Sequence, residues 1–160
     1  MSEDQETRAA ALWEEGTRSL LSGDIEDAID FFTRSLKVLP TAEGYTFRGW
    51  AFSHQGRFDE AILECQKAIA TDPSFGNPYN DIGCYLMSLK RSSESIPWFK
   101  KAKKAERYEP RHFPSLNLGR IHFERGEFAE AFTEFQEALE WHPNDPVASA
   151  FLARMRTQVN

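Results

Sequence analysis

Histidine and cysteine are the residues that most often bind metals or act as nucleophiles, and this chain has few of them. Its two cysteines lie nineteen positions apart and outside any Cys-x-x-Cys pair, and its four histidines are not spaced as ligands on one helical face. We therefore expect no metal site, no disulfide framework and a reducing, cytoplasmic setting. The residues concerned are Cys65, Cys84, His54, His112, His122 and His142.

Motifs for catalysis are also missing from the sequence. It contains no glycine-rich phosphate loop, no His-Glu-x-x-His, no Ser-His-Asp order and no carboxylate pair at a recognisable turn. The sequence therefore predicts a protein that is not an enzyme, with no catalytic residues and no small-molecule cofactor.

The charge balance argues against two further classes of partner. The 160 residues carry a formal charge of −6 with a pI near 5.3, whereas affinity for nucleic acid comes from cationic side chains that release counterions. No apolar run approaches bilayer length, and Met1 to Gln5 is acidic and polar, unlike the start of a secretory signal. We expect no membrane contact and no whole-domain binding of nucleic acid.

The most regular feature of the chain is a set of residues that position helices. Six positions recur with the same internal spacing after 33 residues, and two further copies follow after shifts of 34 and 36. The copies are Gly16, Gly23, Ala28, Phe32, Ser35, Pro40; Gly49, Gly56, Ala61, Cys65, Ala68, Pro73; a degenerate Gly83, Lys90, Ser95, Phe99, Ala102, Arg107; and Gly119, Gly126, Ala131, Phe135, Ala138, Pro143.

Each recurring position has a physical reason. The first glycine and the small residue at the third position let two helices approach closely. The second glycine suits a chain reversal with positive φ, and the proline ends the second helix because it lacks an N–H. This pattern resembles the tetratricopeptide repeat family. The resemblance implies an all-α fold, a right-handed α-solenoid of antiparallel helix pairs with about four repeats and a C-terminal capping helix.

This register predicts the organisation of the chain. Pro97 lies inside the sixth expected helix, and the segment from Lys100 to Arg111 is two residues longer than its counterparts, so repeat three should be irregular. The divisions are an acidic tail at 1–8, repeats at 9–41, 42–75, 76–109 and 112–145, and a solvating helix at 146–160. The expected helices are 7–22, 25–38, 42–55, 58–71, 76–89, 93–108, 112–125, 128–141 and 146–158.

The resemblance further implies that the first helix of each pair lines a concave wall that holds a segment of a partner protein. Large apolar residues on successive first helices would be its anchors, and we expect at least two of Trp13, Trp50, Met87 and Phe123 to border the main pocket. Packing of these four between neighbouring helices is the alternative. The predicted groove residues are Trp13, Trp50, Asn77, Asn80, Met87, Leu116, Arg120 and Phe123.

Family members that hold the C-terminal carboxylate of heat-shock chaperones carry a lysine and an asparagine on the first helix and a lysine and an arginine on the first helix of repeat three. Those places here read Trp13, Thr17, Asn77 and Asp81. The resemblance therefore implies that this carboxylate clamp is absent.

A basic segment at 90–111 holds eight of the nineteen lysines and arginines. We expect it on the convex face, with Lys100, Lys103 and Lys104 largely exposed. It is either an ordinary solvated surface or a docking site for an acidic protein, RNA or anionic lipid. The basic patch comprises Lys100, Lys101, Lys103, Lys104 and Arg107.

Glu15 and Arg48 occupy the same repeat position on neighbouring first helices. Packed helices lie about 8–10 Å apart, so we predict a salt bridge that joins repeats one and two, the alternative being that each side chain is solvated separately.

These observations favour a non-enzymatic scaffold or adaptor that holds a peptide or helix of another protein in a concave groove. The alternatives are a cytoplasmic secretion-type chaperone, and binding of RNA or an anionic surface through segment 90–111. Self-association is left open by the sequence.

Overall fold

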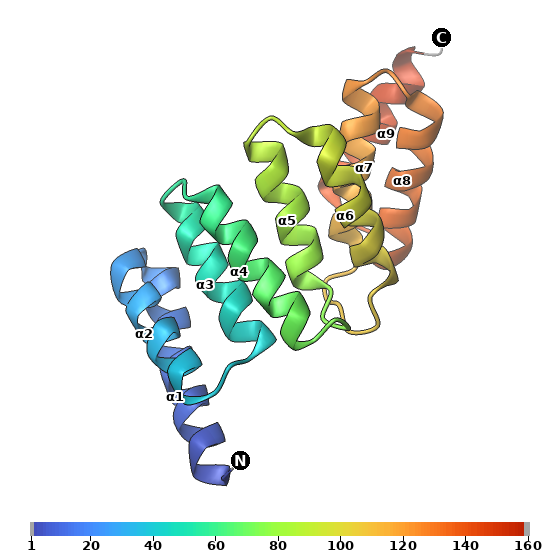
Figure 1. The fold of residues 1–160 in the computed structure, drawn as a ribbon. Coiled ribbons are helices and arrows are strands. Elements are labelled where there is room, and N and C mark those ends of the chain that lie inside the picture. The colour runs from blue at the N-terminus through green and yellow to red at the C-terminus, as the bar shows by residue number, and fades with distance from the viewer. Residues whose placement is uncertain (1, 159–160) are drawn as a thin grey trace.

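The computed structural model describes residues 2–158, and within them it contains nine helices and no strand (Figure 1). Consecutive helices form hairpins, and the hairpins stack in chain order. The helices are α1 (Glu3–Ser22), α2 (Ile25–Val38), α3 (Ala42–His54), α4 (Phe58–Thr71), α5 (Asn77–Ser88), α6 (Ser92–Lys104), α7 (His112–Glu124), α8 (Phe128–Trp141) and α9 (Pro146–Gln158).

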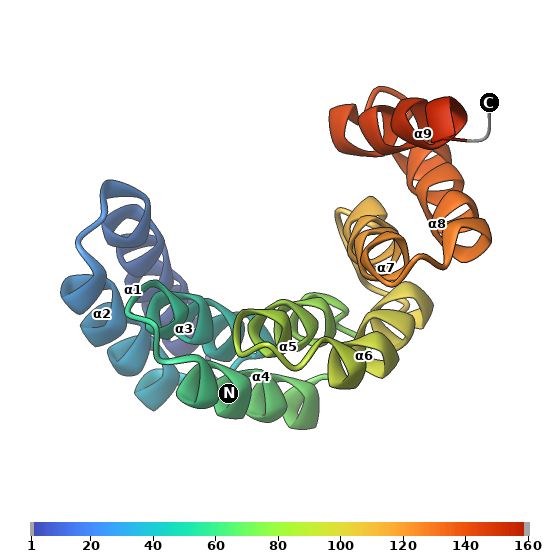
Figure 2. The ribbon, with the colours of Figure 1, turned by 90° about the horizontal axis from the view of Figure 1, so that it is seen from above.

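The hairpins form an arc when viewed from above (Figure 2). Helices α1, α3, α5 and α7 lie on the inner side of the arc, and successive inner helices contact one another. Helices α2, α4, α6 and α8 form the outer side. This arrangement confirms the all-α solenoid with its second helices outside. Ala28, Ala61 and Ala131 are fully buried, as the repeat register predicts.

Close approach inside three of the four repeat hairpins depends on a glycine facing a phenylalanine. A Cβ on Gly83 would lie 2.5 Å from the Phe99 ring, and one on Gly16 would lie 2.7 Å from Phe32. These distances are shorter than any real Cβ contact, so only glycine fits. In repeat two the ring is replaced by Cys65, and a Cβ on Gly49 would be 3.1 Å from the nearest atom.

Two helices, α1 and α6, have bounds that differ from those predicted. Helix α1 begins at Glu3, so residues 3–8, expected as an acidic tail, form its first turns. Acidic side chains in this turn suit the positive end of the helix dipole. Helix α6 begins at Ser92, so Pro97 lies inside it, and the helix ends at Lys104 instead of residue 108.

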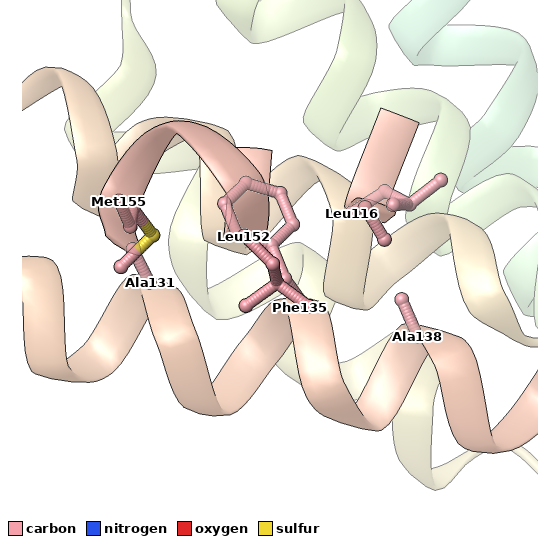
Figure 3. Packing of buried hydrophobic residues seen from close by; sticks show 7 residues of the cluster. Leu116, Ala131, Phe135, Ala138, Leu152 and Met155 are labelled. Carbon is pink, nitrogen blue, oxygen red and sulfur yellow. The ribbon is translucent and has the colours of Figure 1, made fainter. Parts of the chain in front are cut away.

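Helix α9 covers the open end of the array (Figure 2). Ala148, Leu152 and Met155 of α9 are buried against Leu116 of α7 and Phe135 of α8 (Figure 3). Phe151 stacks on Phe135, with ring centroids 4.7 Å apart. Within residues 2–158, none of the helices combines the length and the apolar character that crossing a bilayer requires.

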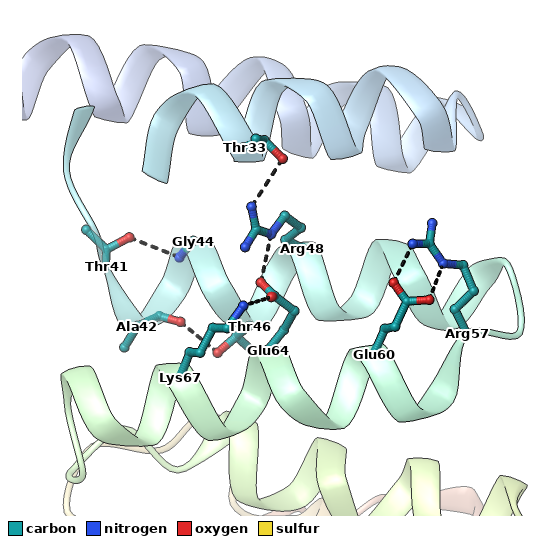
Figure 4. A network of polar contacts seen from close by, with 10 residues as sticks. All are labelled: Thr33, Thr41, Ala42, Gly44, Thr46, Arg48, Arg57, Glu60, Glu64 and Lys67. Atoms are coloured by element: carbon teal, nitrogen blue, oxygen red, sulfur yellow. Dashed lines mark hydrogen bonds and ion pairs between the residues drawn. The ribbon is translucent and has the colours of Figure 1, made fainter. Parts of the chain in front are cut away.

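The predicted Glu15–Arg48 salt bridge is wrong (Figure 4). The Arg48 guanidinium donates to Glu64 at 2.7 Å inside its own hairpin and to the Thr33 hydroxyl at 3.2 Å, which reaches repeat one. Glu15 instead pairs with Arg18, one turn along α1. Arg48 faces the second helices, because the glycine next to it, Gly49, brings α4 within reach.

Candidate functional site: the concave groove

The inner side of the arc contains a groove of about 490 Å³. Three first helices supply most of its lining, with residues one turn apart on the same helical face. Helix α9 and the segment between α6 and α7 complete it. The lining residues are Thr46, Phe47 and Trp50 of α3, Asn77, Asn80, Asp81 and Cys84 of α5, Phe113, Leu116, Asn117 and Arg120 of α7, with Tyr108, Pro110 and Val147.

The three inner helices present the same repeat positions to the groove. At the shifts of 34 and 36 residues, Trp50 corresponds to Cys84 and Arg120. Thr46 corresponds in the same way to Asn80 and Leu116. The groove is therefore built from a few recurring positions, with a different side chain at each repeat.

Five predicted groove residues lie together in the lining: Trp50, Asn77, Asn80, Leu116 and Arg120. Of the four expected anchors, Trp50 alone borders the groove, so the expectation of two or more was wrong. The other three are half-buried elsewhere. Trp13 packs edge-on against Phe47, with ring centroids 5.0 Å apart.

For two of these three anchors the reason lies in their repeat positions. Met87 and Phe123 correspond to each other, but they lie one turn beyond the position of Trp50. There Met87 packs against the cluster around Phe99, and Phe123 packs edge-on against Phe151 of the capping helix. Trp13 stands at the repeat position of Thr46, which lines the groove, but its ring packs against Phe47 instead.

A polar cluster lies in the wall formed by α5 and α7. The Asn117 amide donates to Asn80 Oδ1 at 3.2 Å and to the Cys84 sulfur at 3.5 Å. Burial raises the pKa of the Cys84 thiol to about 12, so this cysteine stays protonated and is a poor nucleophile. Burial also raises the pKa of Asp81 from 3.8 to about 7, against the opposing effect of the Asn80 amide.

The segment between α6 and α7 closes one end of the groove, and its extra length is the one sequence feature that sets it apart. Its backbone runs beside the α4–α5 loop, with Arg107 N–H donating to Ser74 O and Gly76 N–H donating to Arg107 O. The Arg107 side chain pairs with Glu43 and Asp72, each at 2.7 Å. Tyr108 is thereby held against the groove, where it is almost fully buried.

Comparison with known proteins identifies the repeat. One tetratricopeptide repeat model matches residues 42–75 and 115–145, and a second model of the same repeat matches 77–108. The chain belongs to the tetratricopeptide repeat family. Small glutamine-rich tetratricopeptide repeat-containing protein 2 of Saccharomyces cerevisiae is 33% identical over 102 residues, which are 62% of this chain and 30% of that protein. Sperm-associated antigen 1 of Mus musculus is 41% identical over 58 residues, 36% of this chain and 6% of that protein.

The chain thus spans less than a third of the length of these tetratricopeptide repeat relatives. Solved structures show the same fold. The Pseudomonas aeruginosa pilF structure has a TM-score of 0.90 at 22% identity, covering 98% of this chain and 71% of that one. The second tetratricopeptide domain of Spaghetti (RPAP3), bound to the HSP90 peptide SRMEEVD, has a TM-score of 0.60 at 23% identity, covering 66% and 100%.

The basic patch on the outside of the tetratricopeptide array is less cationic than its sequence suggests. Lys100, Lys101 and Lys104 are exposed. Lys103 is not, and the expectation for it was wrong, because its ammonium lies 2.9 Å from Glu134 and 2.6 Å from Glu137 of α8. Arg107 is similarly paired with two carboxylates.

Proposed function

We propose that this chain is a non-enzymatic adaptor whose concave groove holds an apolar peptide or helical segment of a partner protein. The observation that carries the proposal is the apolar surface in the groove. Trp50, Phe113 and Val147 are 39%, 43% and 40% exposed, although all three are large hydrophobic residues. Covering such surface stabilises a complex by about 25 cal/mol per Å² before the costs of association.

Side-chain amides in the groove support recognition of a peptide backbone. The Asn77 amide donates to Glu109 O at 3.2 Å, and the Asn117 amide donates to Asn80. Because these N–H groups are engaged inside the protein, the amide oxygens of Asn77 and Asn117 are the atoms suited to accept hydrogen bonds from a partner. Backbone N–H groups of a bound segment need such acceptors.

The charges in the groove favour a partner segment without acidic groups. The solved neighbour that binds an HSP90 peptide holds the acidic sequence SRMEEVD. Here Asp81 lies in the groove wall, and Arg120 is the one cationic side chain among the lining residues. Above pH 7, where Asp81 is ionised, it would repel a carboxylate, so we expect the bound segment to be apolar with neutral or basic side chains.

The alternative of RNA or anionic-surface binding through the basic patch has less support. Two of its five cationic side chains are paired with carboxylates. Lys101 lies over the Trp98 ring at 4.5 Å, which leaves that ring less open to stack on a base.

A peptide-display selection against the chain tests the adaptor proposal. We expect enriched peptides with apolar anchors, and the Trp50→Ala variant should bind them about thirtyfold more weakly, because a central aromatic anchor contributes about 2 kcal/mol. The matched control is Leu63→Ala, an exposed apolar residue of the outer helix α4.

Two results would contradict the adaptor proposal. One is equal affinity of the wild type and Trp50→Ala for the selected peptides. The other is enrichment of acidic C-terminal peptides alone. A steep loss of affinity with added salt would instead favour the basic patch.

A further inference from the structure

Three potential metal ligands meet where the last three helices join. His112 is the first residue of α7, and His142 is the residue that follows α8. Asp145 precedes α9, and its Oδ1 accepts the Ala148 N–H at 2.8 Å. This hydrogen bond caps α9 and fixes the carboxylate, which leaves Oδ2 directed at the two imidazoles.

The distances among these three side chains are close to those of a coordination sphere. Asp145 Oδ2 is 3.3 Å from His142 Nδ1 and 3.8 Å from His112 Nε2. One ligand atom of each residue lies within 4.8 Å of both others. Ligands of a tetrahedral zinc ion with bonds of about 2.0–2.2 Å are about 3.3 Å apart. The two imidazole rings are stacked, with centroids 4.7 Å apart and planes 28° apart, so the side chains must rotate for their nitrogens to converge on one ion.

The burial and charge of the cluster also suit a cation. The Asp145 side chain is 7% exposed, and within residues 2–158 its ionisable contacts are the two histidines, with no lysine or arginine paired to it. A buried carboxylate without a permanent cation is costly.

We propose that His112 Nε2, His142 Nδ1 and Asp145 Oδ2 form a binding site for a divalent transition metal of the Zn²⁺ class. Two imidazoles and one carboxylate favour such a cation over Mg²⁺ or Ca²⁺, which take oxygen ligands. The His142 side chain is half exposed, so the fourth position is open to water. A bound ion would tie α7, the end of α8 and the start of α9 together at one end of the groove, next to Phe113 and Val147.

Zinc titration of the untagged chain by calorimetry tests the site. We expect one equivalent to bind, and His142→Ala and Asp145→Asn should each bind at least about tenfold more weakly. Asp145→Asn keeps an oxygen for the Ala148 N–H, and His142 is exposed, so both variants should fold, which circular dichroism checks. The matched control is His54→Ala, an exposed histidine on α3.

Two spectroscopic and thermal readouts accompany the titration. Zinc should raise the unfolding midpoint of the wild type and of His54→Ala but not of the two ligand variants. Cobalt should give the visible absorption of a four-coordinate site in the wild type and lose it in the variants. Absence of zinc binding by the wild type, or equal binding by the ligand variants, would overturn the proposal.

Discussion

At the scale of single residues, the contribution of a charged side chain to stability depends more on the groups around it than on its position in the repeat. Arg48 and Glu64 form an ion pair with 15% and 5% of their side chains exposed (Figure 4). Arg57 and Glu60 form another in the same hairpin, with 42% and 51% exposed. Exposed pairs contribute little, whereas breaking a buried pair leaves a desolvated charge.

We predict that Glu64→Gln lowers the free energy of unfolding by about 3 kcal/mol, because it leaves Arg48 without its carboxylate. The control Glu60→Gln should cost much less, because both members of that pair are exposed. Urea denaturation of the three proteins measures both values. Equal losses for the two variants would show that the Arg48–Glu64 pair is no more important than a surface pair.

Asp81 should make stability depend on pH. Its pKa is raised to about 7 in the folded protein, so between pH 4 and 7 the folded state binds its proton more tightly than the unfolded state does. Stability from this group is therefore lost as pH rises through that range. Asp81→Asn should be more stable than the wild type at pH 8, by at most about 4 kcal/mol, and equal to it near pH 3.

Urea unfolding of the wild type and Asp81→Asn at a series of pH values checks this, with Asp59→Asn on the exposed surface of α4 as the control. If the difference between wild type and Asp81→Asn is the same at every pH, Asp81 has an ordinary pKa.

At the scale of elements, the hairpin turns of repeats one, two and four place a glycine at positive φ, whereas the turn of repeat three places a lysine there. Gly23, Gly56 and Gly126 have φ of 85°, 71° and 74°, and Lys90 takes the same conformation with φ of 62°. A residue with a Cβ is strained there, whereas glycine is not. The turn of repeat three between α5 and α6 is therefore less stable than its counterparts.

We predict that Lys90→Gly raises the free energy of unfolding by about 1 kcal/mol by relieving this strain. Lys101→Gly, the same substitution inside α6, should lower it by about 1 kcal/mol. Chemical denaturation of both variants separates the effect of backbone conformation from that of lost charge. A loss of stability in Lys90→Gly would mean that the lysine side chain stabilises the turn.

At the scale of the whole molecule, stability is distributed along the arc because each hairpin packs mainly against its sequence neighbours. The end of such an array depends on its cap. In α9, Leu152 and Met155 are buried against α7 and α8 (Figure 3).

We predict that Leu152→Ala costs about 3 kcal/mol through the cavity it leaves. The loss should be local, so amide hydrogen exchange should accelerate in α7, α8 and α9 and change little in α3 and α4. Equal acceleration in α3 and α4 would show that the array unfolds as one cooperative unit.

Much of the fold could be predicted from the sequence, because its determinants are local and repeated. Glycine opposite phenylalanine, small residues such as Ala61, and prolines at fixed spacing specify each hairpin from its own residues. Helix ends differed where tertiary contacts intervene. Helix α6 ends at Lys104 because the following segment pairs its backbone with the α4–α5 loop, thirty residues earlier in the chain.

The sites depended on contacts that no local pattern encodes. Trp50, Asn80 and Arg120 were predicted because their helix faces follow from the repeat, whereas Tyr108 and Val147 reach the groove from a loop and the last helix. His112 and His142 lie in different helices and come together with Asp145 only when α7, α8 and α9 pack. The helices and their inward faces follow from local sequence, since both depend on residues a few positions apart. Which side chains from distant segments share a site follows from the packing of the whole array, because that depends on how the hairpins stack.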